Sequence, residues 1–435
     1  MTMLVNKSSL TLFCFFLAIA FSSFFKKIEL FAGLGLISFL DELAILVGFF
    51  ASSVKIRKVF FNRFKLFLVL FSIYITFSII SLVKNLGVRV DLITYQMVSE
   101  LKLPMILFIL CSQMSRLFLD DALRILKIIL DSILFLSLPF VAFQVLMPEQ
   151  YDIVFSAGGH FGDAYFGSLS FNRAAGFFWF TGEFAVVMAF LSASYMFLRT
   201  MFSPVGYIVR VFFAVFLLLL SFSRQEIFSF LVSISFVLYA SAKKPIYFSF
   251  RKITFIFFNV SGLLLLVSFA SLLFMDLNIS NFENTSVARL VFYLRSFEIA
   301  VDYFPFGSGL GTFGGAAAEK FNSPIYYDYG MNVYWWYKEN KFLTDTWYPH
   351  VLGEAGVIGA LFYSFALLSL YFFCKRRGLR VENSNVGSLA KFSIVFLCVN
   401  SISSPNLADS VSLSFLLLPF GLMFARTDGE CYGRN

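Results

Sequence analysis

The sequence contains few charged residues for its length. Of its 435 residues, 14% are charged and 59% are hydrophobic. A soluble globular domain carries roughly a quarter charged residues and keeps most of its large apolar side chains inside. The scarcity of charge therefore excludes an ordinary water-soluble domain and indicates a chain that lies largely within a lipid bilayer.

Histidine and cysteine are also scarce. The two histidines are His160 and His350, and the five cysteines show no CxxC spacing. Two histidines are too few for a multi-histidine metal centre, and cysteines dispersed in apolar runs do not indicate a disulfide framework or a zinc site. The sequence therefore predicts no bound metal.

Two motifs of nucleotide and zinc chemistry are missing. The chain has no GxxxxGK[ST] phosphate loop and no HExxH motif. These motifs supply backbone donors for phosphate oxygens and paired histidines for zinc. Their absence disfavours a nucleotide-driven pump and a zinc enzyme, and we predict that the protein uses no cofactor.

Long apolar runs, bounded by polar or basic residues, recur along the whole chain. Hydrocarbon offers no hydrogen-bond partner to the backbone, so runs of this length are predicted to be helices. We predict an all-α integral membrane protein with about twelve transmembrane helices, at residues 10–25, 28–51, 66–83, 103–118, 125–147, 177–198, 205–221, 224–241, 252–275, 347–374, 388–404 and 408–425. The first run is interpreted as a span rather than a cleaved signal peptide, because Lys26 and Lys27 follow it without a small-residue cleavage site. Residues 28–51 contain Asp41 and Glu42 and could form one span with an acidic pair or two short re-entrant pieces.

The distribution of basic residues predicts which loops face the cytoplasm. Three basic groups stand out: Lys55, Arg57, Lys58, Arg63 and Lys65; Lys243, Lys244, Arg251 and Lys252; and Lys375, Arg376, Arg377, Arg380 and Lys391. By the positive-inside rule these groups and both termini lie in the cytoplasm, and we interpret them as topology signals rather than a nucleic-acid-binding surface. Residues 1–435 then form one membrane domain. A large, partly helical outward loop, residues 276–346, lies between the ninth and tenth spans, and a shorter outward loop lies at about 148–176.

Three arginines that are far apart in sequence are predicted to lie near the outward face. Arg173 precedes the sixth span, Arg224 begins the eighth, and Arg289 lies on a predicted helix at 286–302. A guanidinium group binds phosphate oxygens with a rigid bidentate fork and stays charged. Converging arginines at an outer membrane face therefore suit a lipid-linked diphosphate. Contact with lipid headgroups is the alternative for each of them.

The segment that leads into the tenth span is rich in aromatic residues. Trp335, Trp336, Trp347 and Tyr348 could stack on sugar rings, or they could form an interfacial aromatic belt. A stretch with alternating glycines, residues 305–311, permits a tight turn and close backbone approach, and a plain turn is the default prediction.

Three ionisable residues accompany the start of the tenth span. Asp345 could accept the proton of a sugar hydroxyl as a general base, or it could cap the helix that follows. His350 could support the reaction, or it could be an ordinary interfacial histidine. Glu354 lies within the span, so we expect it to have a partner or to face a wet cavity.

These segments together resemble the O-antigen polymerase and ligase family of bacterial envelope glycosyltransferases, which includes the Wzy-type polymerases. The matching pieces come in the family's order: Arg173 with Gly176, Ser223-Arg224, Arg289 followed by Pro305 to Gly311, and Asp345 through Glu354 to Gly359. The resemblance implies a GT-C-like membrane enzyme of the inner membrane whose active site faces the periplasm. It further implies that arginines hold the diphosphate of an undecaprenyl-diphosphate-linked oligosaccharide. A sugar hydroxyl would be the acceptor, and no metal or nucleotide sugar would take part.

One departure from the family pattern bears on the reaction. The ligases usually carry His-Asn nine residues before the glutamate of the last motif, where this chain has Asp345-Thr346. This departure favours a polymerase of O-antigen or capsule repeat units, working beside a chain-length regulator and a flippase in the same membrane. It leaves open whether His350 takes over a role. The alternatives are a ligase that transfers the glycan to lipid A core in lipopolysaccharide biosynthesis, and a lipid-linked oligosaccharide flippase or other transporter, for which Asp41 and Glu42 are the main support.

Overall fold

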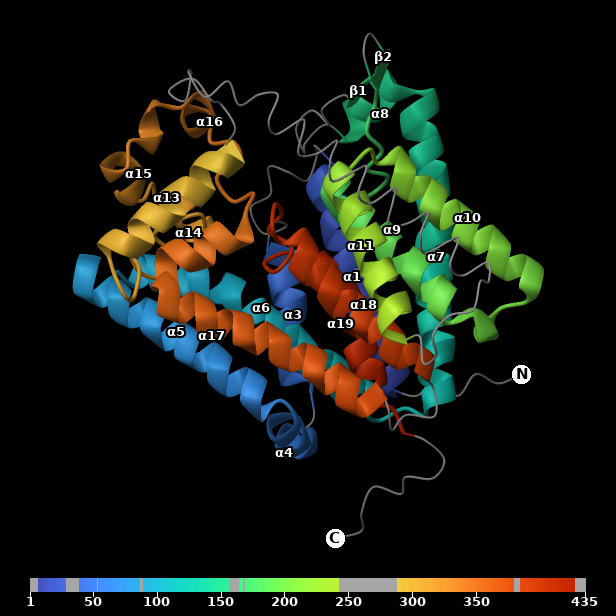
Figure 1. The fold of residues 1–435 in the computed structure, drawn as a ribbon. Coiled ribbons are helices and arrows are strands. Elements are labelled where there is room, and N and C mark those ends of the chain that lie inside the picture. The colour runs from blue at the N-terminus through green and yellow to red at the C-terminus, as the bar shows by residue number, and fades with distance from the viewer. Residues whose placement is uncertain are drawn as a thin grey trace.

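The computed structural model describes residues 7–28, 39–52, 54–86, 89–155, 164–166, 169–241, 288–378 and 384–426. Figure 1 shows long helices packed side by side, with a group of short helices at one end. The helices before residue 242 are α1 (Lys7–Lys27), α3 (Leu40–Phe50), α4 (Val54–Arg63), α5 (Lys65–Leu86), α6 (Val90–Met114), α7 (Leu119–Leu146), α8 (Pro148–Phe155), α9 (Thr181–Phe197), the 3-10 helix η3 (Arg199–Met201), α10 (Pro204–Leu220) and α11 (Arg224–Ser241). The later ones are α13 (Ala288–Asp302), α14 (Ala316–Lys320), α15 (Ile325–Asp328), the 3-10 helix η5 (Met331–Val333), α16 (Trp335–Lys338), α17 (Trp347–Gly378), α18 (Ser384–Asn400) and α19 (Ser410–Leu422).

Five of the described helices are long and apolar enough to cross a membrane. They are found at Leu10–Lys27, Lys65–Leu86, Val90–Met114, Leu119–Leu146 and Trp347–Lys375, and four shorter apolar helices lie at Thr181–Phe197, Pro204–Leu220, Asn385–Asn400 and Ser410–Leu422. The predicted all-α, multi-pass membrane fold is confirmed at this level. The number of twelve spans stays a prediction, and residues 252–275 lie outside the described part of the chain.

One predicted span is placed differently by the structure. Helix α6 begins at Val90 rather than at residue 103 and ends at Met114 rather than at 118. Its first turns carry Gln96 and Glu100, which lower the local hydropathy but are buried among other helices. A hydropathy window therefore misses this half of the helix, because its polar side chains are satisfied inside the protein rather than by water.

The acidic pair within predicted span 28–51 has basic partners. Asp41 lies 2.7 Å from Lys26 and 3.7 Å from Lys102, and Glu42 lies 2.7 Å from Lys102. Opposite charges at these distances offset much of the cost of desolvating the carboxylates. The pair is therefore part of an ion-pair network at the start of α3, and the structure describes residues 39–52 but not the preceding 29–38.

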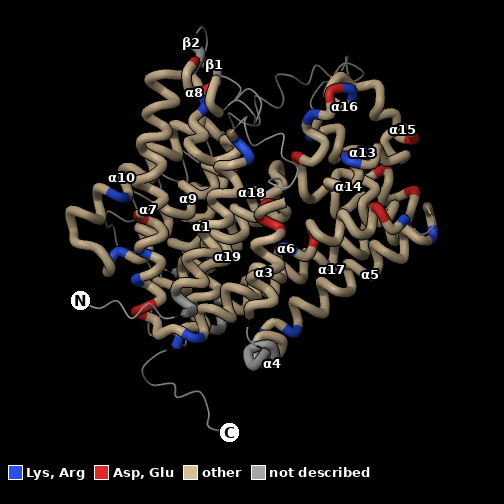
Figure 2. Tube along the Cα trace, turned by 180° about the vertical axis from the view of Figure 1, so that it is seen from behind, with Lys and Arg blue, Asp and Glu red and all other residues tan. Residues whose placement is uncertain are grey.

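A cap of short helices, α13 to α16, covers one end of the bundle (Figure 1). It has its own apolar core, which includes Phe292, Phe313, Tyr326 and Trp336. The hairpin of two three-residue strands, β1 (Ala164–Phe166) and β2 (Leu169–Phe171), lies at the same end, and α4 lies at the opposite end (Figure 1). Figure 2 shows Lys, Arg, Asp and Glu mainly towards the two ends and on the cap. We refer to the end with the cap and the hairpin as the cap end.

The predicted outward loop 276–346 corresponds to this cap from residue 288 onward, and residues 276–287 lie outside the described part. Within the cap, the helix predicted at 286–302 is α13, and it packs against α17. Helix α17 also packs along α5, which brings the cap, α5 and α17 together at one place. The site described next lies at this junction.

Candidate functional site

Helix α17 is interrupted at Gly356, which has φ 64° and ψ −170°. Such a break leaves carbonyl groups of the preceding turn without intrahelical donors. The amide of Ser308 donates to the carbonyl of Gly353 at 2.9 Å, and the amide of Gly309 donates to that of Glu354 at 2.9 Å. Residues 305–315, here called the glycine loop, thus complete the hydrogen bonding of the interrupted helix.

The other side of the glycine loop lies against α5. The amide of Leu310 donates to the carbonyl of Ser78 at 2.9 Å. Gly309 has φ +116°, and a Cβ built there would lie 2.3 Å from the Cα of Leu82. The glycines predicted to form a turn therefore allow the chain to pass between α5 and α17 with backbone touching backbone.

Glu354 holds the next part of the glycine loop. Its side chain is fully buried, and it accepts hydrogen bonds from the amides of Gly311 at 2.7 Å and Phe313 at 3.0 Å. Each carboxylate oxygen therefore takes one backbone donor. The structure gives Glu354 the partners that a charged residue within a span was expected to need.

His350 lies beside Glu354 and is buried with it. Its Nε2 is 2.9 Å from Oε1 of Glu100, and its Nδ1 is 2.9 Å from the carbonyl oxygen of Phe313 and 3.3 Å from Oε1 of Glu354. Gln96 Nε2 donates to Glu100 Oε1 at 3.1 Å. We call Gln96, Glu100, His350 and Glu354 the buried polar cluster. His350 has 1% of its surface exposed, so it is enclosed by the protein, and the supporting part predicted for it stays a prediction.

Gln96 and Glu100 were not identified from the sequence as site residues. The sequence did contain one indication of them, because an amide and a carboxylate four residues apart face the same side of a helix. The partner, His350, is 250 residues away from Glu100. No local pattern could have paired them.

Asp345 lies at the junction of the cap and α17 and faces Arg289. Nη2 of Arg289 is 3.2 Å from Oδ2 of Asp345, and the two side chains are 46% and 30% exposed. An ion pair with this much exposure contributes at most about 1 kcal/mol to stability and exchanges partners readily. The carboxylate predicted to be the base and an arginine predicted to bind phosphate are therefore adjacent and accessible.

Arg173 is held against the junction of α10 and α11. Its Nη2 donates to Oγ of Ser223 at 2.9 Å, and its carbonyl accepts from Nε2 of Gln144 at 2.9 Å. Burial lowers the pKa of the Arg173 guanidinium, the negative charge of Glu226 raises it, and the positive charges of Arg224 and Arg289 lower it. These charges act on Arg173 because the fold brings the three arginines close together.

Arg224 begins α11, and its side chain is exposed. Among the residues that the structure describes, no hydrogen bond or ion pair holds its guanidinium group. Arg289 is paired with Asp345 and the carboxylate of Glu226 acts on Arg173, so within this cluster it is the guanidinium of Arg224 that offers a bound anion charge not already neutralised.

The four aromatic residues predicted to contact sugar have different environments. Trp336 is fully buried and packs against Phe292, with ring centres 5.6 Å apart. Trp347 is 4% exposed and packs on the His350 ring at 5.0 Å. Tyr348 donates to the carbonyl of Cys398 at 2.8 Å, and Trp335 is 45% exposed. Trp336 and Trp347 therefore serve packing in this conformation, while Trp335 presents its indole to the surface.

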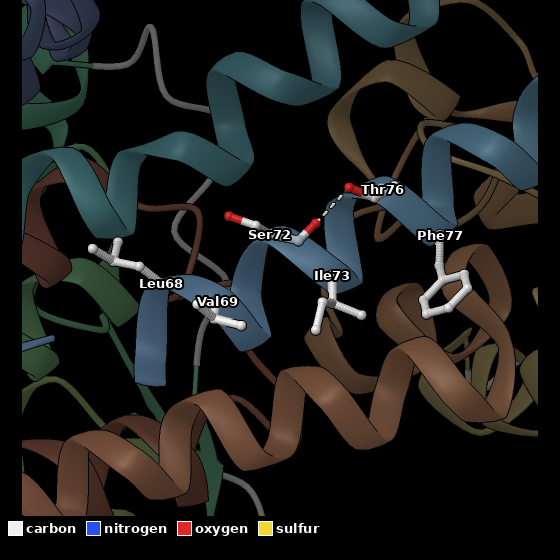
Figure 3. A pocket seen from close by; sticks show the side chains of 6 residues that line it. All are labelled: Leu68, Val69, Ser72, Ile73, Thr76 and Phe77. Atoms are coloured by element: carbon white, nitrogen blue, oxygen red, sulfur yellow. Dashed lines mark hydrogen bonds between the residues drawn. The ribbon is translucent and has the colours of Figure 1, made fainter. Parts of the chain in front are cut away.

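Two pockets lie on the helices that meet at the junction of the cap, α5 and α17. One, of about 200 Å³, includes Tyr293 and Phe297 of α13 and Tyr348 and Leu352 of α17. The larger, of about 430 Å³, lies along α5 and contains none of the predicted site residues; it is formed by Leu68, Val69, Ser72, Ile73, Thr76 and Phe77 (Figure 3). The Thr76 hydroxyl in it already donates to the carbonyl of Ser72 at 2.8 Å, and the other residues that form it, apart from Ser72, are apolar.

The carboxylates of the buried polar cluster face backbone amides and a histidine rather than a common empty point. In the described ranges, no group of three or more His, Cys, Asp or Glu side chains is arranged to hold a metal ion. That the protein works without a metal stays a prediction.

In a comparison with protein families, residues 209–364 match a family described as O-antigen ligase. The matched segment runs from α10 into α17 and contains Arg224, Arg289, Asp345, His350 and Glu354, while Arg173 lies before it. A search of curated proteins finds no significant match.

Proposed function

Since residues 209–364 identify the chain as a member of the O-antigen polymerase and ligase family, we propose that it is a polysaccharide repeat-unit polymerase. It would transfer a glycan from undecaprenyl diphosphate to the terminal sugar hydroxyl of a lipid-linked repeat unit. The reaction would take place at the periplasmic face of the bacterial inner membrane. The observation that carries this proposal is the arginine cluster beside Asp345 at the cap end.

The donor's diphosphate would bind at Arg173, Arg224 and Arg289. Guanidinium groups stabilise the charge that grows on the diphosphate as the glycosidic bond breaks. Arg224 and Arg289 are exposed, and Arg173 is held by Ser223 with its guanidinium in the same cluster. The cluster therefore has the charge that a diphosphate leaving group requires.

Asp345 would act as the general base. Its carboxylate would take the proton of the acceptor hydroxyl as the oxygen attacks the anomeric carbon of the donor, and the bond from that carbon to the diphosphate oxygen would break. In the structure this carboxylate is paired with Arg289. A diphosphate bound at Arg289 would compete for the guanidinium and leave the carboxylate free to accept the proton.

The choice of polymerase over ligase rests on residue 345. The resembling ligases have a histidine at this place, and this chain has Asp345. We propose that His350 does not replace that histidine, and its burial among Glu100, Glu354 and Phe313 supports this choice. A ligase that uses lipid A core as acceptor remains the second candidate, since the matched family is described as O-antigen ligase.

The test is chain extension by purified protein in lipid nanodiscs supplied with an undecaprenyl-diphosphate-linked repeat unit. A polymerase yields a ladder of longer lipid-linked glycans without a metal or nucleotide. A ligase yields product only when lipid A core is added. Movement of the lipid-linked repeat across vesicles without any new glycosidic bond would instead support a flippase.

Arginine variants examine the same proposal residue by residue. Arg224→Ala should reduce extension by about 10-fold or more, because a charge-assisted hydrogen bond contributes roughly 1.5–3 kcal/mol. Arg224→Lys should also be impaired, since an ammonium group lacks the bidentate fork. Arg295→Ala is the matched control, because Arg295 lies on α13 like Arg289 but pairs with Glu298. Equal activity of the Arg224→Ala and Arg295→Ala variants would leave headgroup contact as the better account of Arg224.

A further inference from the structure

The buried polar cluster takes no part in the chemistry described above. Glu354, His350 and Glu100 are all buried, and the proposed function assigns none of them a contact with the donor or the acceptor. Yet two carboxylates and an imidazole are costly to place inside a protein unless their hydrogen bonds are well satisfied. We therefore looked for the part of the protein whose position the cluster fixes.

Phe313 is the residue that the cluster holds most closely. Its amide donates to Glu354 at 3.0 Å, and its carbonyl accepts from Nδ1 of His350, which lies 2.9 Å away. Both polar groups of one peptide segment are thus fixed by side chains from the same face of α17. This fixes where the Phe313 side chain points.

The Phe313 ring connects the cluster to the arginine site. It packs against the ring of Phe292, with centres 5.3 Å apart. Phe292 lies on α13, three residues after Arg289 and therefore about one helical turn away from it. A contiguous path runs from Glu354 through Phe313 and Phe292 to the helix that carries Arg289.

The charge of Glu354 suits this task better than a neutral amide would. Its two oxygens accept from two different backbone amides, those of Gly311 and Phe313. Glutamine would direct its NH₂ group at one of these amides and leave that donor unpaired. A carboxylate in a buried setting also forms shorter and stronger hydrogen bonds than an amide oxygen does.

We propose that Glu354 is a positioning residue for the donor diphosphate, acting through Phe313 and Phe292 on the placement of Arg289. The inference rests on the proposed function, since it assumes that Arg289 binds the diphosphate. It assigns the buried polar cluster the task of keeping α13 at a fixed distance from the start of α17. Glu354 itself contacts neither donor nor acceptor.

The experiment is a double-mutant cycle on binding of undecaprenyl diphosphate, measured with the full-length protein in nanodiscs. Glu354→Gln should raise the Kd about 5-fold with the same number of sites per protein, and Arg289→Ala should raise it about 10-fold or more. In the Arg289→Ala background, Glu354→Gln should then change the Kd by less than about 2-fold, because residues that act as one unit are not additive. A purely structural role would lower the number of binding sites and leave the Kd unchanged.

A second variant covers the case in which Glu354→Gln does not fold. Phe292→Leu keeps an apolar side chain and all the hydrogen bonds of the cluster, and it should reproduce the rise in Kd and the non-additivity with Arg289→Ala. Asp131→Asn is the control, since it breaks the ion pair with Arg210, away from the arginine cluster, and should leave the Kd unchanged. If Glu354→Gln or Phe292→Leu changes the Kd by the same factor in the unmodified protein and in the Arg289→Ala variant, the inference is wrong. The proposed function would still stand in that case. Lack of diphosphate binding by the unmodified protein overturns the proposed function and the inference with it.

Discussion

The first segment of α17 has an acidic residue near each end, and the two carboxylates lie in different environments. Asp345, just before the helix, shares an exposed ion pair with Arg289. Glu354, near the break at Gly356, is buried and bound to two backbone amides and close to His350. An exposed pair is weak and can be exchanged for a ligand, whereas a buried, fully bonded carboxylate is fixed. Within a few turns, one acidic residue is suited to react and the other to hold the structure.

The largest expected effect concerns the exposed end. Asp345→Asn should lower chain extension by about 10²- to 10⁴-fold, the usual cost of losing a general base. Asparagine caps helices well, so this variant separates the base from the alternative role of helix cap. The measurement is the initial rate of extension at matched protein amounts. A rate near that of the unmodified protein would mean that Asp345 only caps the helix and that the base lies elsewhere.

At the buried end, a substitution of Glu354 should lower the stability of the protein. Glu354→Ala leaves the amides of Gly311 and Phe313 and the ring of His350 without their partner, and breaking such a buried set costs about 3–5 kcal/mol. Asp345→Ala, at the exposed end, should cost at most about 1 kcal/mol. Thermal unfolding of both variants in the same detergent provides the comparison. Similar losses of stability in the two variants would remove the distinction drawn between the two ends.

The smallest expected effect concerns Trp335, which is compared with its neighbour Trp336 in α16. Trp335 is 45% exposed and Trp336 is fully buried. Trp335→Ala should raise the acceptor KM by a few-fold, since an aromatic contact contributes about 0.5–1.5 kcal/mol, and should leave the melting temperature unchanged. Trp336→Ala should destabilise the cap, because removing a core aromatic costs about 3–5 kcal/mol. An unchanged KM for Trp335→Ala would favour the alternative that Trp335 belongs to an interfacial aromatic belt and does not contact the sugar.

The glycines show how far a local pattern can be interpreted. The alternation in 305–311 predicted a tight turn, and the residues there do have positive φ at Gly307, Gly309 and Gly311. The sequence did not reveal that this segment lies between α5 and α17. That placement depends on the break at Gly356, which is 49 residues later than Gly307 in a chain whose intervening part forms the cap. Positive φ is a local property, but close backbone approach depends on which helix lies next to the loop.

The sequence by itself determined the class of this protein. Scarce charge and long apolar runs predict membrane helices, and the order of Arg173, Arg224, Arg289 and Asp345 through Glu354 resembles the family that residues 209–364 match. These properties depend on local composition or on the order of residues along the chain, so they can be recognised without knowledge of the fold. The tertiary structure alone decided which of these residues meet.

Three decisions belong to the tertiary structure. It paired Asp345 with Arg289, gathered the three arginines, and enclosed His350 between Glu100 and Glu354. These contacts depend on how α6, α11, α13 and α17 and the segment before α9 pack, and packing is set by side chains on helix faces that are far apart in sequence. Hydropathy records how much each segment avoids water, but not which neighbour satisfies its few polar groups. For that reason the sequence could propose His350 as a supporting catalytic residue, and only the fold could show that it is buried.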